Sequence, residues 1–219
     1  MVDPQVLGSN GGVASRQPCA SLTRKLIHLA MAILPAVGWW ISYGLALALT
    51  ATMLSASLIM EVARRWWPWF NRLLWRLLPT VFRESEGHRV LGSTWFAVGA
   101  LVSLLVFGRD IGGTAVLFLS WGDPVAEIVG ARWGRAGQGK TTVGSLGCLL
   151  ACIVAGFVGV GLGGLSPWAV LVGAAVATLV ERWSPPPNDN LWMPVLSGFG
   201  IVLAQGLIGG ETVLLPVWR

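Results

Sequence analysis

Apolar stretches close to the length of a membrane span make up most of this chain and limit what it can fold into. A helix that crosses the hydrocarbon core of a bilayer needs about 20 mostly apolar residues. We predict seven such helices, at approximately Leu26–Ser42, Tyr43–Val62, Val90–Phe107, Ile111–Val129, Leu146–Gly163, Pro167–Val180 and Leu191–Ile208. Only 11% of the residues are charged, against about 25% in soluble domains. The sequence therefore predicts an all-α, polytopic membrane helical bundle.

Two further segments complete the predicted organisation. Residues 1–22 are polar and lack a long apolar core, so we expect a short flexible tail and not a secretory signal peptide. The segment RRWWPWFNRLLWRLLPTVFRESEGHR alternates Arg with Trp, Phe and Leu, which is typical of an amphipathic helix at the membrane interface. Residues 23–219 then form a single transmembrane domain, with no room for a separate soluble unit.

The positions of the basic residues predict the orientation. The net charge is +5, but the basic residues lie at the ends of apolar runs and not in one stripe, which argues against a nucleic-acid partner. With the N-terminus inside, every Lys and Arg except Arg109 and Arg219 falls on the cytoplasmic side. Cytoplasmic loops of membrane proteins carry such an excess. We therefore expect an integral membrane protein with a cytoplasmic N-terminus, in the inner membrane if the source is bacterial.

This topology places five polar segments at the cytoplasmic ends of the predicted spans. They are RKLIH, RESEGHR, WGDPVAEIVG, GKTTVGS and ERWSPPPNDN. Polar loops also gather on one side by chance, but five such clusters favour a site that faces cytosolic solutes.

Asp123 is the strongest single signal, because it lies within an apolar run. A carboxylate inside a span costs about 2.5–3.5 kcal/mol on insertion scales and is usually functional. We expect its neighbours Gly122 and Pro124 to break the helix. Glu127 lies four residues further on, so a resumed helix places both carboxylates on one face.

Two close carboxylates suit a Mg²⁺ ion that keeps several waters and binds substrate phosphates. Alternatively, the pair is structural and bonded to Arg132 or Lys140.

Residues Gly134 to Thr141, GRAGQGKT, fit the phosphate-loop pattern G-x-x-x-x-G-K-[ST]. That motif requires a preceding strand, and here an apolar span precedes it. We predict instead a Gly-rich basic loop in which Lys140, Thr141 and Ser145 hold phosphate, the alternative being an ordinary positive loop. On this interpretation Lys140→Ala is crippling, whereas Gly134→Ala is mild.

Other polar residues give weaker signals. Lys25 and His28 lie on one helical face at the start of the first predicted span. Alternatively, Lys25 is a charge that sets the topology, and His28 is an interfacial histidine. Glu181 closes the sixth span, and Asp189-Asn190 precede the seventh.

The ordered set of motifs resembles the membrane-bound, CTP-dependent polyprenol kinase family, which includes dolichol kinase, phytol kinase and the yeast-type diacylglycerol kinase. The resemblance runs from about Arg24 to Gly198. It rests on RKLIH, Glu61 with Arg64, RESE before GSTWFAVGAL, GDPVAEIVGARWG, KTTVGS and ATLVERWSPPPNDNLWMPVLSG. Three positions depart from the family pattern, namely Val143 for Glu, Asn188 for Asp and Glu127 for Asp.

The resemblance implies a lipid kinase that transfers the terminal phosphoryl group of CTP, or of another nucleoside triphosphate, to a long-chain isoprenoid alcohol or to diacylglycerol. With the chemistry of the residues, it implies Asp123 as Mg²⁺ ligand or hydroxyl base and Lys140 as the second catalytic residue. Glu127 and Asp189 would assist the metal. The nucleotide and phosphates would be held by Gly122, Arg132, Arg135, Thr141, Gly144, Ser145 and Asn190. The headgroup would meet Lys25, His28, Arg83 and Glu84.

Two other classes remain as alternatives. A CTP-dependent cytidylyltransferase acting on a lipid phosphate would use similar parts. A small transporter would show an internal repeat, and none is evident.

The predicted orientation is tested by single cysteines in a background without the three native ones. In intact cells, an impermeant thiol reagent should label Gly164→Cys but neither Lys140→Cys nor Asp189→Cys. The reverse labelling pattern would refute the orientation.

Overall fold

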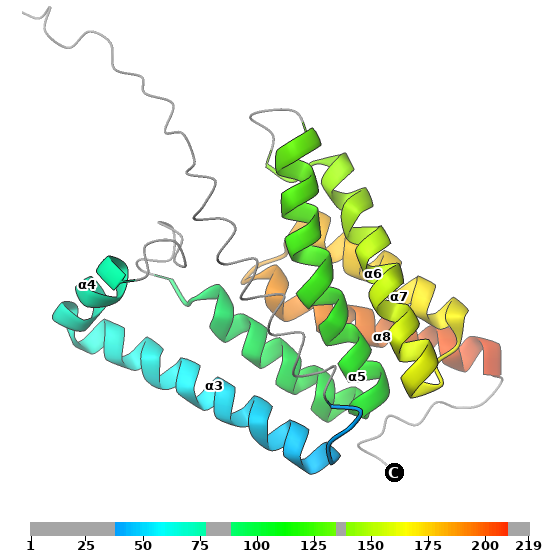
Figure 1. The fold of residues 1–219 in the computed structure, drawn as a ribbon, viewed down its shortest axis with the longest axis horizontal. Coiled ribbons are helices and arrows are strands. Elements are labelled where there is room, and N and C mark those ends of the chain that lie inside the picture. The colour runs from blue at the N-terminus through cyan, green and yellow to red at the C-terminus, as the bar shows by residue number, and fades with distance from the viewer. Residues whose placement is uncertain (1–37, 78–88, 135–138, 210–219) are drawn as a thin grey trace, which may run out of the picture.

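The computed structural model describes residues 38–77, 89–134 and 139–209. The helices in these ranges are α3 (Tyr43–Trp66), α4 (Pro68–Leu77), α5 (Gly92–Trp133), α6 (Thr142–Gly163), α7 (Pro167–Trp183) and α8 (Asp189–Gly209) (Figure 1). The described ranges contain no strand, which confirms the all-α prediction. The predicted tail and most of the first predicted span lie outside the described residues.

The described residues contain four helices long and apolar enough to cross a membrane, namely α3, α5, α6 and α8. Helix α5 has 42 residues and covers two predicted spans. Helix α7 has 17 residues, fewer than the roughly 20 that a span needs. The structure therefore supports a polytopic bundle without reproducing the count of seven.

Helix α5 reverses direction at Gly108. This residue has φ 75° and ψ −170°, a conformation essentially restricted to glycine. The two legs on either side then pack closely, since a Cβ on Gly112 would lie 2.5 Å from the carbonyl oxygen of Ser103. Figure 1 shows the legs as a hairpin in the middle of the bundle. The break falls between two predicted spans, of which the first ends at Phe107 and the second begins at Ile111.

The predicted break at Gly122 and Pro124 is wrong, because α5 remains helical through both residues. A proline inside a helix removes one backbone hydrogen bond, which neighbouring helices and side chains can offset in a membrane protein. The reversal occurs instead at Gly108, the residue of α5 that has a positive φ.

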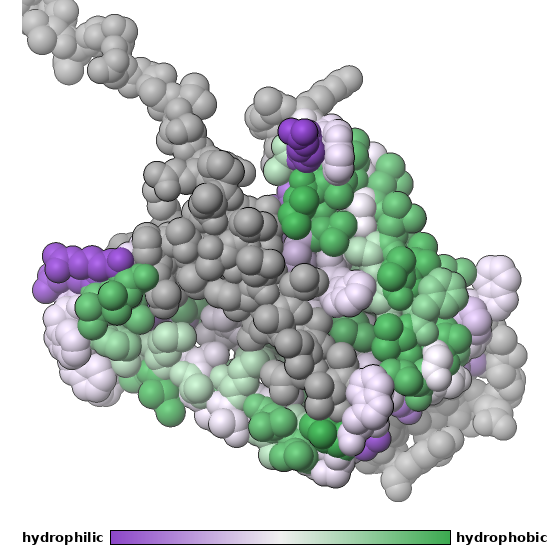
Figure 2. Space-filling model, in the orientation of Figure 1, coloured by the Kyte–Doolittle hydropathy of each residue, from purple (hydrophilic) through white to green (hydrophobic). Residues whose placement is uncertain are grey.

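Glycines let the helices of the core approach one another closely. A Cβ on Gly99 of α5 would lie 2.6 Å from the carbonyl oxygen of Asn190, and one on Gly156 of α6 would lie 2.2 Å from Val170 of α7. Small residues at such contacts are typical of membrane helices. Large apolar side chains such as Leu150 and Leu203 are instead exposed. Figure 2 shows apolar side chains over much of the visible surface of the described helices, as expected of a surface that faces lipid.

The polar segments meet at one end of the bundle. Lys140 contacts Asp189 there, and the Asn190 side chain bonds to Gly92. At the opposite end the Trp39 indole donates a hydrogen bond to Asp110. The segments that contain Lys140, Glu181 and Asp189 therefore share one end, as the topology predicted.

The predicted amphipathic segment forms α4 over part of its length. None of the α4 residues is buried, and Trp69, Arg72 and Leu77 are exposed. Its place at the membrane interface stays a prediction.

The reversal at Gly108 predicts a specific sensitivity to substitution. Gly108→Ala should destabilise the protein by about 1–3 kcal/mol, because alanine strongly disfavours this backbone conformation. Thermal unfolding, followed with a thiol-reactive dye that reports exposure of the buried Cys148 and Cys152, measures the loss. Gly161→Ala in α6 is the matched control, since a Cβ there meets nothing within 4 Å. Equal unfolding temperatures for the two variants would contradict the assigned role of Gly108.

Candidate active site

Lys140 lies at the centre of the polar end, immediately before α6. Its Nζ is 2.6 Å from Asp189 Oδ2 and 3.1 Å from Glu181 Oε1. These partners come from the start of α8 and the last turn of α7. The backbone oxygen of Lys140 also accepts a hydrogen bond of 2.9 Å from Arg182. One side chain thus ties together three segments that are distant in sequence.

A third carboxylate, Asp123 on α5, acts on the same ammonium group electrostatically. Burial opposes the charged form of Lys140, but the negative charges of Asp189, Asp123 and Glu181 outweigh it and raise the lysine pKa above its ordinary value. Lys140 therefore stays protonated at physiological pH. The structure brings Asp123, Lys140 and Asp189 into one cluster, as the sequence predicted.

Glu181 is the functional candidate that the sequence analysis underrated. It is 5% exposed, and its carboxylate contacts both Lys140 and the Ser145 hydroxyl, which donates a hydrogen bond of 3.3 Å. The available signal was a carboxylate at the end of an apolar run. That signal is weak, because many interfacial carboxylates also end membrane helices.

The spacing within GKTTVGS has a local structural explanation. Thr141 is the N-cap of α6, and its hydroxyl accepts a hydrogen bond of 3.0 Å from the Gly144 backbone N–H. A Cβ on Gly144 would lie 2.7 Å from the carbonyl oxygen of Ala126, so this glycine allows α6 to approach α5. Phosphate binding by Thr141 and Gly144 stays a prediction.

The structure argues against the expectation that Gly134→Ala is mild. A Cβ there would lie 2.6 Å from Thr141 Cγ2 and 2.9 Å from Thr141 Oγ1. Gly134→Ala would thus disturb the cap of α6 whatever the loop binds. In contrast, a Cβ on Gly139 meets nothing within 4 Å.

The start of α8 is fixed by two asparagines. The Asn188 side chain accepts a hydrogen bond of 2.9 Å from the Asn190 N–H, as an N-cap residue does. The Asn190 side chain is buried and donates to the Gly92 carbonyl oxygen at 2.9 Å. These bonds join α8 to the first turn of α5 and hold Asp189 in place beside Lys140.

The remaining predicted residues have varied positions. Glu127 is half-buried one turn after Asp123, and Arg132 is exposed in the last turn of α5. Gly122 is buried. A Cβ there would lie 2.7 Å from Cys152 Sγ and 2.8 Å from Met193 Cε, so this glycine allows α5 to pack closely against α6 and α8. Five predicted site residues lie outside the described residues, namely Lys25, His28, Arg83, Glu84 and Arg135.

A buried ion pair holds the segment that leads into α5. Glu61 and Arg64 of α3 are 2.8 Å apart and almost fully buried. Glu61 also accepts a hydrogen bond of 2.6 Å from the Leu91 N–H, and Arg64 donates to the carbonyl oxygen of Arg89. This pair anchors the chain immediately after RESEGH at the same end of the bundle.

The donor chemistry at this end fits Mg²⁺ that arrives with a nucleotide. Among the described residues, no three His, Cys, Asp or Glu side chains are grouped tightly enough to hold a metal ion alone. However, Mg²⁺ is usually bound through one or two carboxylates together with substrate phosphates and waters. Asp189 and Asp123 are such carboxylates and would hold Mg²⁺, which would neutralise charge on the substrate phosphates.

Comparison with known proteins identifies the family. The CTP-dependent diacylglycerol kinase 1 of Schizosaccharomyces pombe is 31% identical over 156 residues, which cover 63% of this chain and 71% of that protein. The chain belongs to the family of CTP-dependent polyprenol and diacylglycerol kinases. It is therefore a phosphotransferase with an alcohol group as acceptor.

Two other relatives extend the comparison. The CTP-dependent diacylglycerol kinase 1 of Saccharomyces cerevisiae is 26% identical over 169 residues, covering 64% of this kinase and 57% of that protein. The phytol kinase of Synechocystis sp. is 28% identical over 191 residues, covering 80% and 76% of the two chains. No family model and no solved structure matches the kinase.

Two departures from the family pattern are compatible with the geometry of the site. Val143, where the pattern has Glu, is 40% exposed on the first turn of α6. Asn188, where the pattern has Asp, caps α8 through its side-chain oxygen, and Asp caps helices equally well. Neither change removes a contact of Lys140.

The geometry separates this kinase from a true phosphate-loop protein. Gly139→Ala should leave activity within about twofold, because the added methyl group enters open space, whereas Lys140→Ala should reduce kcat about 100-fold or more. Steady-state kinetics of purified protein measure both. A phosphate loop needs its glycines for close backbone approach to the nucleotide, so an equally severe loss for Gly139→Ala would restore that interpretation.

Proposed function

We propose that this kinase transfers the terminal phosphoryl group of CTP to the hydroxyl of a membrane lipid, either a long-chain isoprenoid alcohol or diacylglycerol. The relatives named above as diacylglycerol kinases and as a phytol kinase support both acceptor classes. The observation that carries the proposal is the Lys140 cluster at one end of an apolar bundle. A lipid hydroxyl and a water-soluble nucleotide can meet only where such a site borders both membrane and solvent.

The Lys140 cluster suits a nucleotide because its ion pairs can be exchanged. One ammonium contacts Asp189 and Glu181 directly and also interacts electrostatically with Asp123. A Mg²⁺–triphosphate complex offers a cation for the carboxylates and phosphate oxygens for Lys140. Phosphoryl transfer asks a protein chiefly for such positioning and charge neutralisation.

The proposed reaction uses Asp123 next to the reacting atoms, as metal ligand or as base. The lipid hydroxyl oxygen bonds to the terminal phosphorus, and the bond from that phosphorus to the bridging oxygen breaks. CDP leaves, and the hydroxyl proton passes to a carboxylate. Asp189 and Glu127 assist with Mg²⁺, while Arg132 and Arg135 contact the triphosphate.

The headgroup side of the site is proposed for four residues that lie outside the described ranges. Lys25, His28, Arg83 and Glu84 would contact the acceptor there. The Glu61–Arg64 pair supports this assignment, because it fixes the chain at Arg89 and Leu91, a few residues after Glu84 in the sequence. We also propose that this end of the bundle faces the cytoplasm, where CTP is available.

The fate of a phosphorus label in CTP tests the proposed reaction. Purified protein is given CTP labelled at the terminal or at the innermost phosphorus, with phytol, farnesol, diacylglycerol or phosphatidate as acceptor. A kinase places the terminal label in the lipid when the acceptor is an alcohol and releases CDP. Innermost label in lipid with phosphatidate, together with pyrophosphate, would instead establish a cytidylyltransferase.

Substitutions at the cluster test the assignment of the site. Asp123→Asn and Asp189→Asn should each lower kcat about 100-fold or more, since each removes a charge that neutralises the transition state. Arg72→Ala on the exposed face of α4 is the control and should retain activity. Near-normal turnover in Asp123→Asn, in a sample with an unchanged unfolding temperature, would end the assignment of Asp123.

A further inference from the structure

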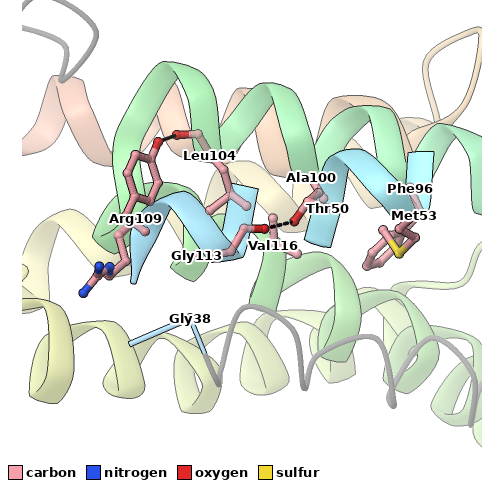
Figure 3. Close-up of a pocket in the computed structure, with 11 residues that line it drawn as sticks. Gly38, Thr50, Met53, Phe96, Ala100, Leu104, Arg109, Gly113 and Val116 are labelled. Carbon is pink, nitrogen blue, oxygen red and sulfur yellow. Dashed lines mark hydrogen bonds between the residues drawn. The ribbon is translucent and has the colours of Figure 1, made fainter. Parts of the chain in front are cut away.

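A pocket lies between α3 and the two legs of α5. Its volume of about 440 Å³ includes space that is open to the surroundings, so it is a groove and not an enclosed cavity. Its walls include Ala46, Thr50 and Met53 of α3 and Phe96, Ala100 and Leu104 of α5. Figure 3 shows Arg109 at one end of this pocket and Met53 with Phe96 at the other. We call it the α3–α5 groove.

The lining of the α3–α5 groove is apolar, because its few hydroxyl groups are already bonded. The Thr50 hydroxyl donates to the carbonyl oxygen of Ala46 at 2.8 Å. The Tyr43 hydroxyl donates to the carbonyl oxygen of Leu104 at 2.5 Å. Neither group needs a ligand to satisfy it, so the groove favours a hydrocarbon occupant over a polar one.

One end of the groove lies close to the Lys140 cluster. Phe96 follows Gly92 by four residues, which is roughly one helical turn, or about 6 Å along the axis. The Gly92 carbonyl oxygen accepts the hydrogen bond from Asn190, next to Asp189. A chain that leaves the groove past Phe96 thus arrives beside the residues that contact Lys140.

The length of the groove matches one leaflet of a membrane. From Tyr43 to Met53, α3 rises about 15 Å, which is half of the roughly 30 Å hydrocarbon core. Tyr43 and Arg109 mark the far end. A single hydrocarbon tail fits such a space along its length, with its polar head at the end near Phe96.

We propose that the α3–α5 groove binds the hydrocarbon tail of the lipid acceptor and sets the acceptor chain length that the kinase prefers. This inference rests on the proposed function, since it assigns a place to that acceptor. Ala46 and Ala100 are the specificity-determining residues, because each has a small side chain that faces the groove and is almost fully buried.

Filling the groove tests this assignment. Ala46→Leu and Ala100→Leu should lower kcat/KM for phytol and for long-chain diacylglycerol about 10-fold or more, while a five-carbon prenol keeps its wild-type value. The ratio of long-chain to short-chain kcat/KM therefore falls in both variants. Ala48→Leu is the matched control, because Ala48 lies on the exposed side of α3 and the added bulk enters the lipid phase. An unchanged ratio in both folded groove variants would overturn the proposal.

Photolabelling provides a second measurement that does not depend on these variants folding. A phytol analogue with a diazirine in its tail, bound to wild-type protein in lipid nanodiscs and irradiated, should form adducts on peptides that contain Thr50, Met53 or Phe96. An excess of unlabelled phytol should suppress these adducts. Adducts confined to other helices, or groove adducts that phytol does not displace, would show another occupant and refute the proposal. The two proposals fail in different ways. If the wild type transfers no label from CTP to any acceptor, the proposed function is wrong. If the enzyme is active but the groove variants keep the wild-type chain-length ratio, only the groove assignment is wrong.

Discussion

The ammonium group of Lys140 is the contact on which the polar end of this kinase depends. Asp189, Glu181 and Asp123 belong to three different helices, and their carboxylates would repel one another without a cation between them. Lys140 supplies that cation from the loop before α6, at 2.6 Å from Asp189 and 3.1 Å from Glu181. The bonds around it, from Arg182 to the Lys140 backbone and from Asn190 to Gly92, then fix where these helix ends lie. The same charge balance that orders the unliganded site prepares it for a metal–phosphate complex.

The general architecture follows from the sequence because it depends on local properties. Apolar length predicts α3, α6 and α8 nearly to their ends, and the break between Phe107 and Ile111 was expected. The additional break predicted at Gly122 and Pro124 was wrong, because Pro124 looks like a helix breaker in isolation. Its effect is local, whereas the positive φ of Gly108 is required by tertiary packing of one leg on the other. Local sequence carries little information about such a contact.

The sequence predicts site residues where a single residue is unusual in its local sequence. Asp123 is conspicuous inside an apolar run, and Lys140 and Asp189 belong to ordered motifs. Glu181 was harder to recognise, because its importance comes from contacts with Lys140 and Ser145 that are 41 and 36 residues away in the sequence. Gly134 and Gly144 illustrate the opposite case, in which residues that look like phosphate ligands are required for packing around Thr141 and Ala126. Spacing alone does not separate these two uses of glycine.

The hairpin in α5 has a consequence for how two substrates meet. Its first leg carries Phe96 and Ala100, which line the proposed acceptor groove, and its second leg carries Asp123 and Glu127. A lipid and a nucleotide would therefore be handled by two legs of a single folded helix, and not by independent parts of the protein. Gly108 and the close contact of Gly112 with Ser103 fix how far one leg slides against the other. The alignment of the attacking oxygen with the phosphorus is then set at the opposite end of the bundle, far from any reacting atom.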